Sequence, residues 1–361
     1  MRLLVTGGSG FIGSNFVRYA LGVTDDVRIT NLDALTYAGN PASLADVADD
    51  PRYRFVHGDV RDADLVDRVV ADHDAVVHFA AESHVDRSIE GPAVFLDTNV
   101  TGAGVVFDAC RRHDIGRVLH ISTDEVYGSI AEPGTFVEDD PLVPNSPYSA
   151  SKAAADLLAR AYRVTYDYPI MVTRTANNFG PYHYPEKVVP LFVTNLIDGR
   201  KVPLFGDGSN VRDWTYVIDN AAAQWLVLTA GVPGEVYNVG AGSEMSNRDL
   251  TYAILARMGA GEEMIEFVAD RPGHDQRYSV DTTKIRALGW KPSIGFEQAL
   301  DATIDWYRAN EAWWRPLKDG GASTRRGTVP ATTTSPATTT SPAVGSSPAV
   351  GSSPDVGDAP R

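Results

Sequence analysis

Short apolar runs alternate with longer stretches of helical periodicity between residues 1 and 175. The runs predict buried strands at Arg2–Thr6, Val27–Leu32, Tyr53–His57, Ala75–Phe79, Arg117–Ser122 and Ile170–Thr175. The stretches between them predict helices that begin near Phe11 and that cover Arg61–Ala71, Val94–His113 and Tyr148–Tyr166. Strands that alternate with helices at this regularity indicate a parallel sheet, so the expected fold class is α/β.

The pattern loosens after about residue 180, and a last helix is predicted from Phe296 to about Trp314. We expect a first domain at residues 1–180, whose core extends into later segments, and a smaller C-terminal lobe at residues 181–316. Residues 328–361 differ in kind, because T-T-T-S-P-A and V-G-S-S-P each occur twice within them. This segment lacks the apolar side chains that a core needs, so we predict a disordered tail rich in Thr, Ser, Pro and Gly.

The chain is acidic, with a net charge of −15 over 361 residues. Nucleic acids and anionic membranes bind clustered Lys and Arg, so neither is an expected partner. A small anion such as a diphosphate can still be held by a few arginines and helix N-termini. Cys110 is the only cysteine, which excludes an internal disulfide and a metal site built on thiolates, and no metal is expected. We find no cleavable leader and no apolar run long enough to cross a bilayer, and we predict a cytoplasmic protein.

A glycine-rich turn, T-G-G-S-G-F-I-G, joins the first predicted strand to the first helix. Gly7, Gly10 and Gly13 have the spacing that allows a tight turn, close approach to a pyrophosphate and packing of the helix on the strand. Such a turn alone could be an ordinary loop. Asp33, however, ends the second strand, where an acid accepts the ribose hydroxyls of adenosine and disfavours a 2′-phosphate. Together they predict a Rossmann-type, doubly wound sheet that binds NAD in preference to NADP.

Polar residues follow the next two strands, at tips that should lie along the same cleft. Asp59 could bind the adenine amino group or, almost equally well, cap the helix that follows. The fourth strand leads to A-A-E-S-H-V-D, which crowds together Glu82, Ser83, His84 and Asp86. These are more polar groups than a loop needs for solubility.

Two carboxylates, Asp124 and Glu125, follow the fifth strand, where side chains emerge at the carboxyl edge of the sheet. Two adjacent desolvated carboxylates cannot both ionise cheaply, so the pKa of one should rise. The site would then hold a protonated acid beside a carboxylate base.

Tyr148 and Lys152 lie one helical turn apart, in a helix that Ser146 can cap and that Pro147 can begin. An ammonium near the phenol should lower the tyrosine pKa and make it a general base near neutral pH. An isolated Y-x-x-x-K occurs often by chance, in which case the tyrosine is a half-buried aromatic and the lysine a solvated charge. The nucleotide motif and the carboxylate pair that precede it here favour the catalytic interpretation.

Further polar residues follow the sixth strand, in R-T-A-N-N-F-G-P-Y-H-Y-P-E-K. The amides of Asn177 and Asn178 could bond sugar hydroxyls or simply form a turn. Later segments place four more polar side chains in the C-terminal lobe: Arg212, Asn247, Arg271 and His274. Scattered arginines near glycine turns suit a substrate diphosphate, so we expect this lobe to be mainly substrate-binding.

From Met1 to about Trp314 the chain resembles the extended short-chain dehydrogenase/reductases, and specifically the dTDP-glucose 4,6-dehydratase family. The resemblance rests on T-G-G-S-G-F-I-G, T-D-E-V-Y-G, Y-S-A-S-K, N-N-F-G-P-Y-H-Y-P-E-K and R-P-G-H-D-Q-R-Y, in this order. The adjoining Asp124 and Glu125 discriminate, because related epimerases and decarboxylases lack both acids together there. Phe179 stands where the family usually has tyrosine and Ala176 where it has serine, and neither carries chemistry.

The resemblance implies conversion of dTDP-glucose to dTDP-4-keto-6-deoxyglucose by C4 oxidation, elimination of water across C5 and C6, and hydride return to C6. It implies catalytic residues Thr123, Asp124, Glu125, Tyr148 and Lys152. It implies cofactor contacts at Gly7, Gly10, Phe11, Ile12, Gly13, Asp33, Asp59, Val60, Ala80, Ala81, Thr98, Tyr148, Lys152 and Asn178. It implies substrate contacts at Ser83, His84, Asn177, Glu186, Lys187, Arg212, Asn247, Arg271 and His274. It also implies a homodimer, formed through a helix pair that includes the Tyr148 helix.

Other activities stay open at this point. A UDP-sugar dehydratase would differ only in the nucleotide, while a nucleotide-sugar 4-epimerase or decarboxylase shares only the first step and needs no acid at Asp124. A non-catalytic dinucleotide-binding protein could keep the glycines but has no reason to keep Tyr148, Lys152 and the carboxylate pair together. The mass of the product separates dehydration, epimerisation and no reaction.

Overall fold

A computed structural model of the chain describes residues 1–321, so the predicted tail at residues 328–361 lies outside the described residues. The main strands are β1 (Arg2–Thr6), β2 (Arg28–Asp33), β3 (Tyr53–His57), β4 (Ala75–His78), β5 (Arg117–Thr123), β6 (Ile170–Thr175) and β10 (Val236–Val239). They form a seven-stranded sheet in the order β10-β6-β5-β4-β1-β2-β3. Every neighbouring pair is parallel, which confirms the predicted doubly wound α/β fold.

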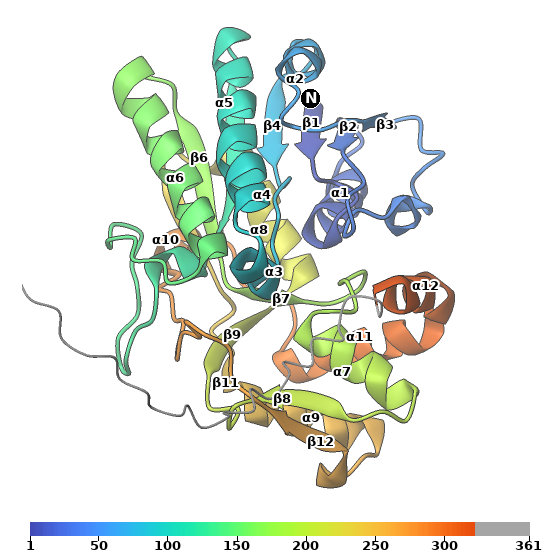
Figure 1. Cartoon of the computed structure of the whole chain (residues 1–361). Helices are drawn as coiled ribbons and strands as arrows, with labels where there is room; N and C mark the ends of the chain where they lie inside the picture. Colours follow the sequence, from blue (N-terminus) through green and yellow to red (C-terminus); the bar gives the residue numbers. More distant parts are fainter. Residues whose placement is uncertain (322–361) are drawn as a thin grey trace, which may run out of the picture. The chain divides into compact units, whose positions relative to one another are not determined.

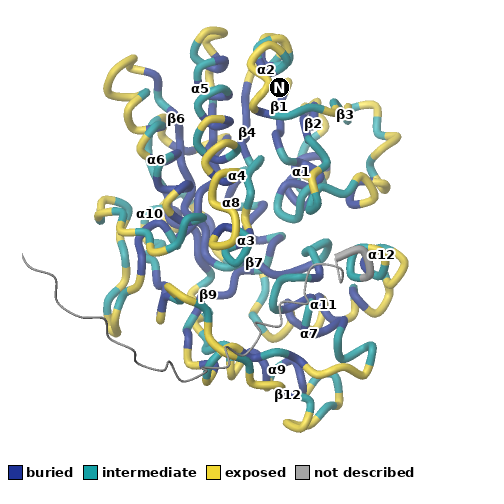
Figure 2. The backbone as a smooth tube through the Cα atoms, viewed as in Figure 1, coloured by how far each residue is buried: buried dark blue, intermediate teal, exposed yellow. Residues whose placement is uncertain are grey.

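Helices cover both faces of this sheet (Figure 1). They are α1 (Phe11–Val23) and α8 (Val217–Ala230) on one face, and α2 (Ala63–Val70), α5 (Ala103–Arg112) and α6 (Pro147–Tyr166) on the other. Successive strand residues point to opposite faces, so Leu3 and Val5 pack with α1 and α8 while Leu4 packs with α2, α5 and α6. The central strands consequently form a buried layer between the helices, while the edge strand β3 is partly exposed (Figure 2).

Two predicted helices are interrupted in the structure. The segment predicted as Val94–His113 consists of α4 (Ala93–Phe95), the π-helical turn η2 (Leu96–Gly102) and α5. In this wider turn Asn99 bonds the backbone of Glu82 and the hydroxyl of Ser151, so it ties the turn to the cleft and to α6. The segment predicted from Phe296 to about Trp314 is split into α11 (Phe296–Ala309) and α12 (Glu311–Gly321), because Asn310 between them leaves the helical backbone conformation.

A smaller lobe lies at the carboxyl edge of the sheet (Figure 1). It contains α7 (Val188–Ile197), α9 (Asn247–Met258), α11, α12 and the strands β7 (Asn177–Phe179), β8 (Val202–Phe205), β9 (Val211–Tyr216), β11 (Glu244–Ser246) and β12 (Ile265–Val268). Its separate core includes the fully buried side chains of Tyr307 and Trp314. Because β10 and α8 belong to the main sheet layer, the first core extends well past residue 180. The division of function at that residue stays a prediction. Within residues 1–321, no helix combines the length and apolarity that a bilayer span requires.

Candidate active site

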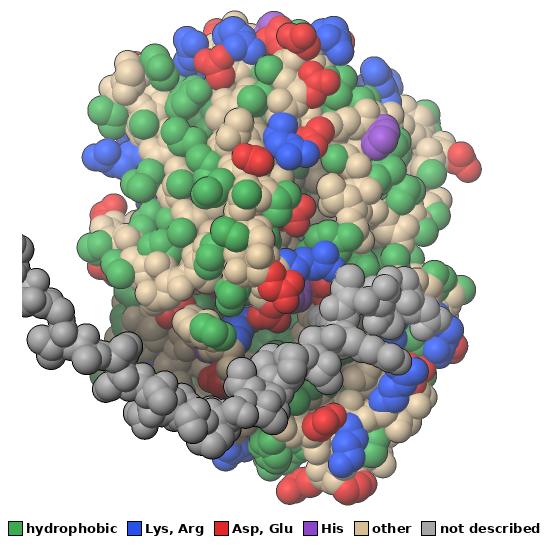
Figure 3. Space-filling model, in the orientation of Figure 1, with side chains coloured by type: hydrophobic (Ala, Val, Ile, Leu, Met, Phe, Trp, Pro, Cys, Tyr) green, Lys and Arg blue, Asp and Glu red, His purple; other side chains and the backbone are tan. Residues whose placement is uncertain are grey.

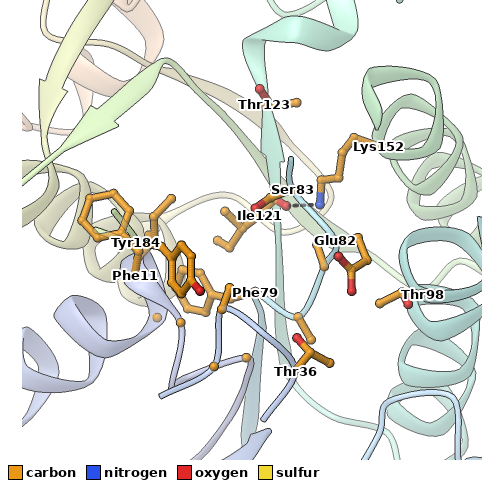
Figure 4. A pocket seen from close by; sticks show the side chains of 18 of the residues that line it. Phe11, Thr36, Phe79, Glu82, Ser83, Thr98, Ile121, Thr123, Lys152 and Tyr184 are labelled. Carbon is orange, nitrogen blue, oxygen red and sulfur yellow. Dashed lines mark hydrogen bonds between the residues drawn. The ribbon is translucent and has the colours of Figure 1, made fainter. Parts of the chain in front are cut away.

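A cleft of about 390 Å³ follows the carboxyl ends of the central strands. It is lined by all the residues predicted to be catalytic, by all those predicted to contact the cofactor, and by Ser83, Asn177, Glu186 and Lys187 of the predicted substrate set. In Figure 4 the rings of Phe11 and Tyr184 lie on one side of this cleft, across from Glu82, Thr98 and Lys152. The cleft therefore brings the predicted cofactor and catalytic residues together.

The glycine-rich turn forms one wall of the cleft without side chains. Gly7 has a φ of 72°, and a Cβ there would lie 2.6 Å from the backbone nitrogen of Ala80. A Cβ on Gly13 would lie 2.3 Å from the carbonyl oxygen of Gly7, so the helix could not pack this closely on the turn. Gly10, the N-cap of α1, provides no side-chain acceptor for the first amides of the helix. This bare helix N-terminus fits the pyrophosphate of a dinucleotide.

Asp33 lies at the end of β2 on the same cleft, and only 7% of it is exposed. Its carboxylate accepts the backbone N–H groups of Ser9 and Leu35, each at 2.8 Å, while burial raises its pKa. Each carboxylate oxygen has a second lone-pair direction that could accept a ribose hydroxyl. Asp59 also lines the cleft but pairs with Arg61 at 2.6 Å, and Asp62 caps α2 instead. The alternative role of Asp59 as a helix cap is therefore wrong.

The acid pair follows β5 at the centre of the cleft. The hydroxyl of Thr123 donates to Asp124 Oδ1 at 3.2 Å and accepts the N–H of Glu125 at 3.3 Å. Asp124 is only 3% exposed, and its Oδ2 has no hydrogen-bond partner among residues 1–321. Burial and, second, the charge of Glu125 raise the pKa of Asp124 to about 8. One acid of the pair is thus protonated at neutral pH, as the sequence predicts.

The Tyr148 helix begins as expected, because Ser146 accepts the N–H of Ser149 at 3.0 Å and Pro147 is the first residue of α6. Lys152 is buried and its Nζ donates to the carbonyl oxygen of Ile121 at 2.6 Å (Figure 4). Burial lowers the pKa of Lys152 to about 8.

The predicted lowering of the Tyr148 pKa is wrong for the protein alone. Burial and the charge of Glu125 raise the pKa of Tyr148, and only the hydrogen bond with Thr123 acts in the opposite direction. The ammonium of Lys152, which donates to the carbonyl oxygen of Ile121, does not bring the pKa of Tyr148 back to its ordinary value. Additional positive charge in the cleft is therefore needed before the phenol becomes an effective base.

Five residues of the predicted substrate set lie outside the lining of the cleft: His84, Arg212, Asn247, Arg271 and His274. His84 caps α3 (Val85–Glu90) and lies 3.8 Å from Glu186. Asn247 begins α9 after its Ser246 cap, and His274 bonds Asp270 at 2.6 Å. The structure does not bring these three side chains to the acid pair.

The two arginines of the predicted substrate set, Arg212 and Arg271, have local partners but still affect the pKa of the acid pair. Arg212 donates to the carbonyl oxygen of Asp275 at 2.9 Å and stacks on Tyr278, while Arg271 pairs with Asp86 at 3.4 Å. Both guanidinium groups lower the pKa of Glu125, although burial raises it more. They therefore provide positive charge beside the reacting centre.

Several cleft residues have no role in the sequence prediction, namely Tyr37, Ser122, His183 and Tyr184, and Glu82 is noted there only as part of a polar cluster. The ring of His183 stacks on that of Phe11 at 3.9 Å, and its carbonyl oxygen accepts the hydroxyl of Tyr307 at 2.5 Å. The sequence signal that could have identified these five residues is their position, because each lies within or beside a segment that the sequence already places at the end of a strand. Within residues 1–321, no group of three or more His, Cys, Asp or Glu is placed to hold a metal ion.

Comparison with known proteins identifies the family. The family model described as GDP-mannose 4,6 dehydratase matches residues 4–303. A dTDP-glucose 4,6-dehydratase of Streptomyces niveus is 54% identical over 329 residues, which cover 90% of this chain and 98% of the relative. The chain belongs to the dTDP-glucose 4,6-dehydratase family.

Two further similarities agree with this family. The crystal structure of DesIV, a dTDP-glucose 4,6-dehydratase from Streptomyces venezuelae with NAD and TYD bound, is 54% identical with a TM-score of 0.86 and covers 88% of this chain and 100% of DesIV. The low-salt glycan biosynthesis protein Agl12 of Haloferax volcanii is 57% identical over 311 residues, which cover 86% of this chain and 100% of Agl12. The family predicted from the motifs is confirmed, together with its NAD-dependent dehydratase chemistry.

Proposed function

We propose that this protein converts dTDP-glucose to dTDP-4-keto-6-deoxyglucose with NAD as its cofactor. The observation that carries the proposal is the buried, neutral Asp124 beside Glu125, in the same cleft as Tyr148 and Lys152. Oxidation alone, or epimerisation, needs no neutral acid at this position, whereas elimination of a hydroxyl group as water does. The dTDP nucleotide is supported by the names of the Streptomyces relatives.

The first step in this proposal is removal of the C4 hydroxyl proton by Tyr148, while the hydroxyl of Thr123 bonds the same sugar oxygen. NAD⁺, when bound along Gly7–Gly13 and Asp33, supplies the hydride acceptor for C4, the hydride donor for C6, and a positive charge. That charge and the ammonium of Lys152 favour the phenolate of Tyr148, whose pKa is raised in the protein alone. The buried cleft keeps water from competing for these protons.

The second step uses the two carboxyl groups. A ketone at C4 makes the C5 proton acidic, and Glu125 accepts it while Asp124 protonates the C6 hydroxyl group that leaves as water. Burial raises the pKa of Glu125, but Arg271 and Lys187 favour its ionisation in addition to Arg212, which acts on both carboxyl groups. Glu125 returns its proton to C5 when C6 is reduced, and the proton from Tyr148 replaces the one that Asp124 gave, so the sugar loses one water overall.

The product assay tests this proposal directly. The purified full-length protein, supplied with NAD, is incubated separately with dTDP-glucose, UDP-glucose and GDP-mannose. The masses of the products are then measured by mass spectrometry. Loss of one water from dTDP-glucose, with slower reaction of the other two, is the expected result. An isomer of unchanged mass would establish epimerisation instead, and faster dehydration of UDP-glucose would replace the dTDP assignment.

We also propose a homodimer formed through α6. Three apolar side chains of this helix are largely exposed, with Leu157 at 56%, Val164 at 70% and Tyr166 at 54%. Hydrophobic side chains gather over α5 and α6 on the face shown in Figure 3. Light scattering should give twice the monomer mass, and Val164→Glu should give the monomer mass. The cytoplasmic location stays a prediction.

A further inference from the structure

Three segments around the cleft contact one another through Arg87 of α3. Its guanidinium carbon lies 3.7 Å from the centroid of the Tyr37 ring, which belongs to the loop after β2. The same guanidinium donates to Glu186, in the loop before α7, at 3.4 Å. The phenol of Tyr37 also hydrogen-bonds Glu186, and its ring meets that of Tyr184 edge-on at 5.6 Å. Tyr37, Arg87 and Glu186 thus form one connected group, which we call the clasp.

The clasp joins opposite sides of the glycine-rich turn. In the sheet, β2 and β4 lie on either side of β1. The glycine-rich turn follows β1, whereas Tyr37 follows β2 and Arg87 follows β4. Tyr37, Glu186 and the glycines line the same cleft. A contact between Tyr37 and Arg87 therefore encloses, together with the turn, the space that suits a dinucleotide.

The clasp also lies at the boundary between the cleft and solvent. The side chain of Arg87 is 37% exposed, whereas that of Glu186 is 8% exposed and faces inward. Beside it, Lys187 Nζ donates to the carbonyl oxygen of Ser83 at 2.9 Å, a second contact between the loop before α7 and the segment after β4. Cation–π and ion-pair contacts at partly exposed sites are weak enough to open and strong enough to slow release.

The proposed reaction, on which this inference rests, uses the cofactor twice in each turnover. Escape of the reduced cofactor after the first use would leave the sugar as an unfinished ketone and the enzyme without a hydride to return. We propose that Tyr37, Arg87 and Glu186 retain the cofactor in the cleft between the two hydride transfers. We assign the three a positioning role, because the proposed proton transfers use Tyr148, Asp124 and Glu125 and none of the clasp residues.

The test is the rate at which cofactor leaves the protein. Arg87→Met keeps the aliphatic stem and removes both the charge and the hydrogen bond. Holoenzyme carrying labelled NAD is mixed with excess unlabelled NAD, and the label that remains bound is followed with time. We expect release to be roughly tenfold faster than in the wild type, the effect of losing one cation–π contact and one charge-assisted hydrogen bond.

Arg315→Met is a matched control. Arg315 is 38% exposed, lies over the ring of Trp314 at 4.6 Å and pairs with Asp198 at 3.1 Å, so it has the same kinds of contact outside the cleft. Its release rate should equal that of the wild type. Equal release rates for Arg87→Met and Arg315→Met would overturn the clasp.

Two further variants separate retention from a general effect on stability. Tyr37→Phe keeps the ring under Arg87 and should release cofactor more slowly than Tyr37→Leu, which removes both of its contacts. If the clasp acts as a unit, adding Arg87→Met to Tyr37→Leu should change the rate of cofactor release little further. Fully additive effects of the two substitutions on this rate would overturn the clasp. During turnover, a scavenging dehydrogenase should capture more NADH from Arg87→Met than from the wild type. Release of NAD needs no sugar nucleotide, so the clasp is tested even if the protein forms no keto sugar.

Discussion

Asp124 and Glu125 are adjacent buried carboxyl groups whose pKa values are both raised, and Glu125 has more cations acting in the opposite direction. Asp124 is 3% exposed, and burial together with the neighbouring carboxylate raises its pKa to about 8. Glu125 also has a raised pKa, but three cations act to lower it: Arg271, Arg212 and Lys187. At pH 7 the pair therefore consists of a neutral Asp124 and a Glu125 that is proposed to ionise more readily than Asp124. Because the two carboxyl groups have different roles, elimination can be tested separately from oxidation.

Replacing Asp124 with Asn should separate the two steps. The amide keeps the volume but has no proton to transfer, so oxidation at C4 should proceed while loss of water slows by roughly 10²–10⁴-fold. Enzyme-bound NADH should then accumulate, which is measured by absorbance after rapid mixing with dTDP-glucose. A folded, NAD-bound Asp124→Asn protein that formed no NADH would rule out the acid role.

Glu125→Gln should accumulate NADH for a different reason. Without this carboxylate the C5 proton stays on the keto sugar, so little deuterium should enter C5 in heavy water. Asp124→Asn, which keeps Glu125, should still exchange this hydrogen. Mass spectrometry of the recovered sugar measures the difference, and equal exchange in the two variants would contradict the division of roles.

The raised pKa of Asp124 predicts a pH dependence. The acid is protonated below about pH 8, so the elimination rate should fall about tenfold per unit above this pH. Between its ordinary value of 3.8 and about 8, Asp124 holds a proton only in the folded state, so the unfolding free energy should decrease as pH rises through this window. Denaturant titrations at both ends of the window should show a smaller decrease for Asp124→Asn. An identical decrease in the two proteins would exclude Asp124 as its source.

Tyr148→Phe should block the reaction before any cofactor is reduced. The ring and its packing remain, but the base for the C4 hydroxyl group is lost, which costs at least roughly 10²–10⁴-fold. Single-turnover absorbance should show no burst of NADH, unlike in either carboxylate variant. Near-normal NADH formation would remove Tyr148 from the mechanism.

Asp33 should set the preference for NAD. Its buried carboxylate would repel the 2′-phosphate of NADP, so the wild type should bind NAD much more tightly. Asp33→Asn removes the charge and should narrow the ratio of the two dissociation constants, measured by the quenching of tryptophan fluorescence. A wild type that bound both cofactors equally would place Asp33 away from the ribose.

Local signals in the sequence predict the parts of the site that local geometry determines. The glycine turn depends on the missing Cβ atoms of Gly7 and Gly13, and the α6 start depends on Ser146 and Pro147, so each can be recognised within a few residues. The raised pKa of Asp124 could be predicted because the residue follows a buried strand and, second, because its neighbour in the chain is also an acid.

Features set by tertiary packing could not be predicted in this way. The pKa of Tyr148 is raised by its burial and then by the charge of Glu125, and both depend on how α6 packs against the end of β5. Similarly, Asn247 looks like a substrate contact in the sequence, but the structure places it outside the lining of the cleft. The contact between Arg87 and Tyr37 joins α3 to the loop after β2, and the separate sequences of these two segments carry no sign of it.

The stacking of Phe11 on His183 has a consequence for biosynthesis. Phe11 opens the first helix, whereas the carbonyl group of His183 is held by Tyr307 of α11. The ribosome synthesises the chain from its N-terminus, so the glycine-rich turn and Phe11 are synthesised early, whereas Tyr307 of α11 is synthesised much later. The stacking partner of Phe11 is therefore held in place by Tyr307 only after α11 has been synthesised.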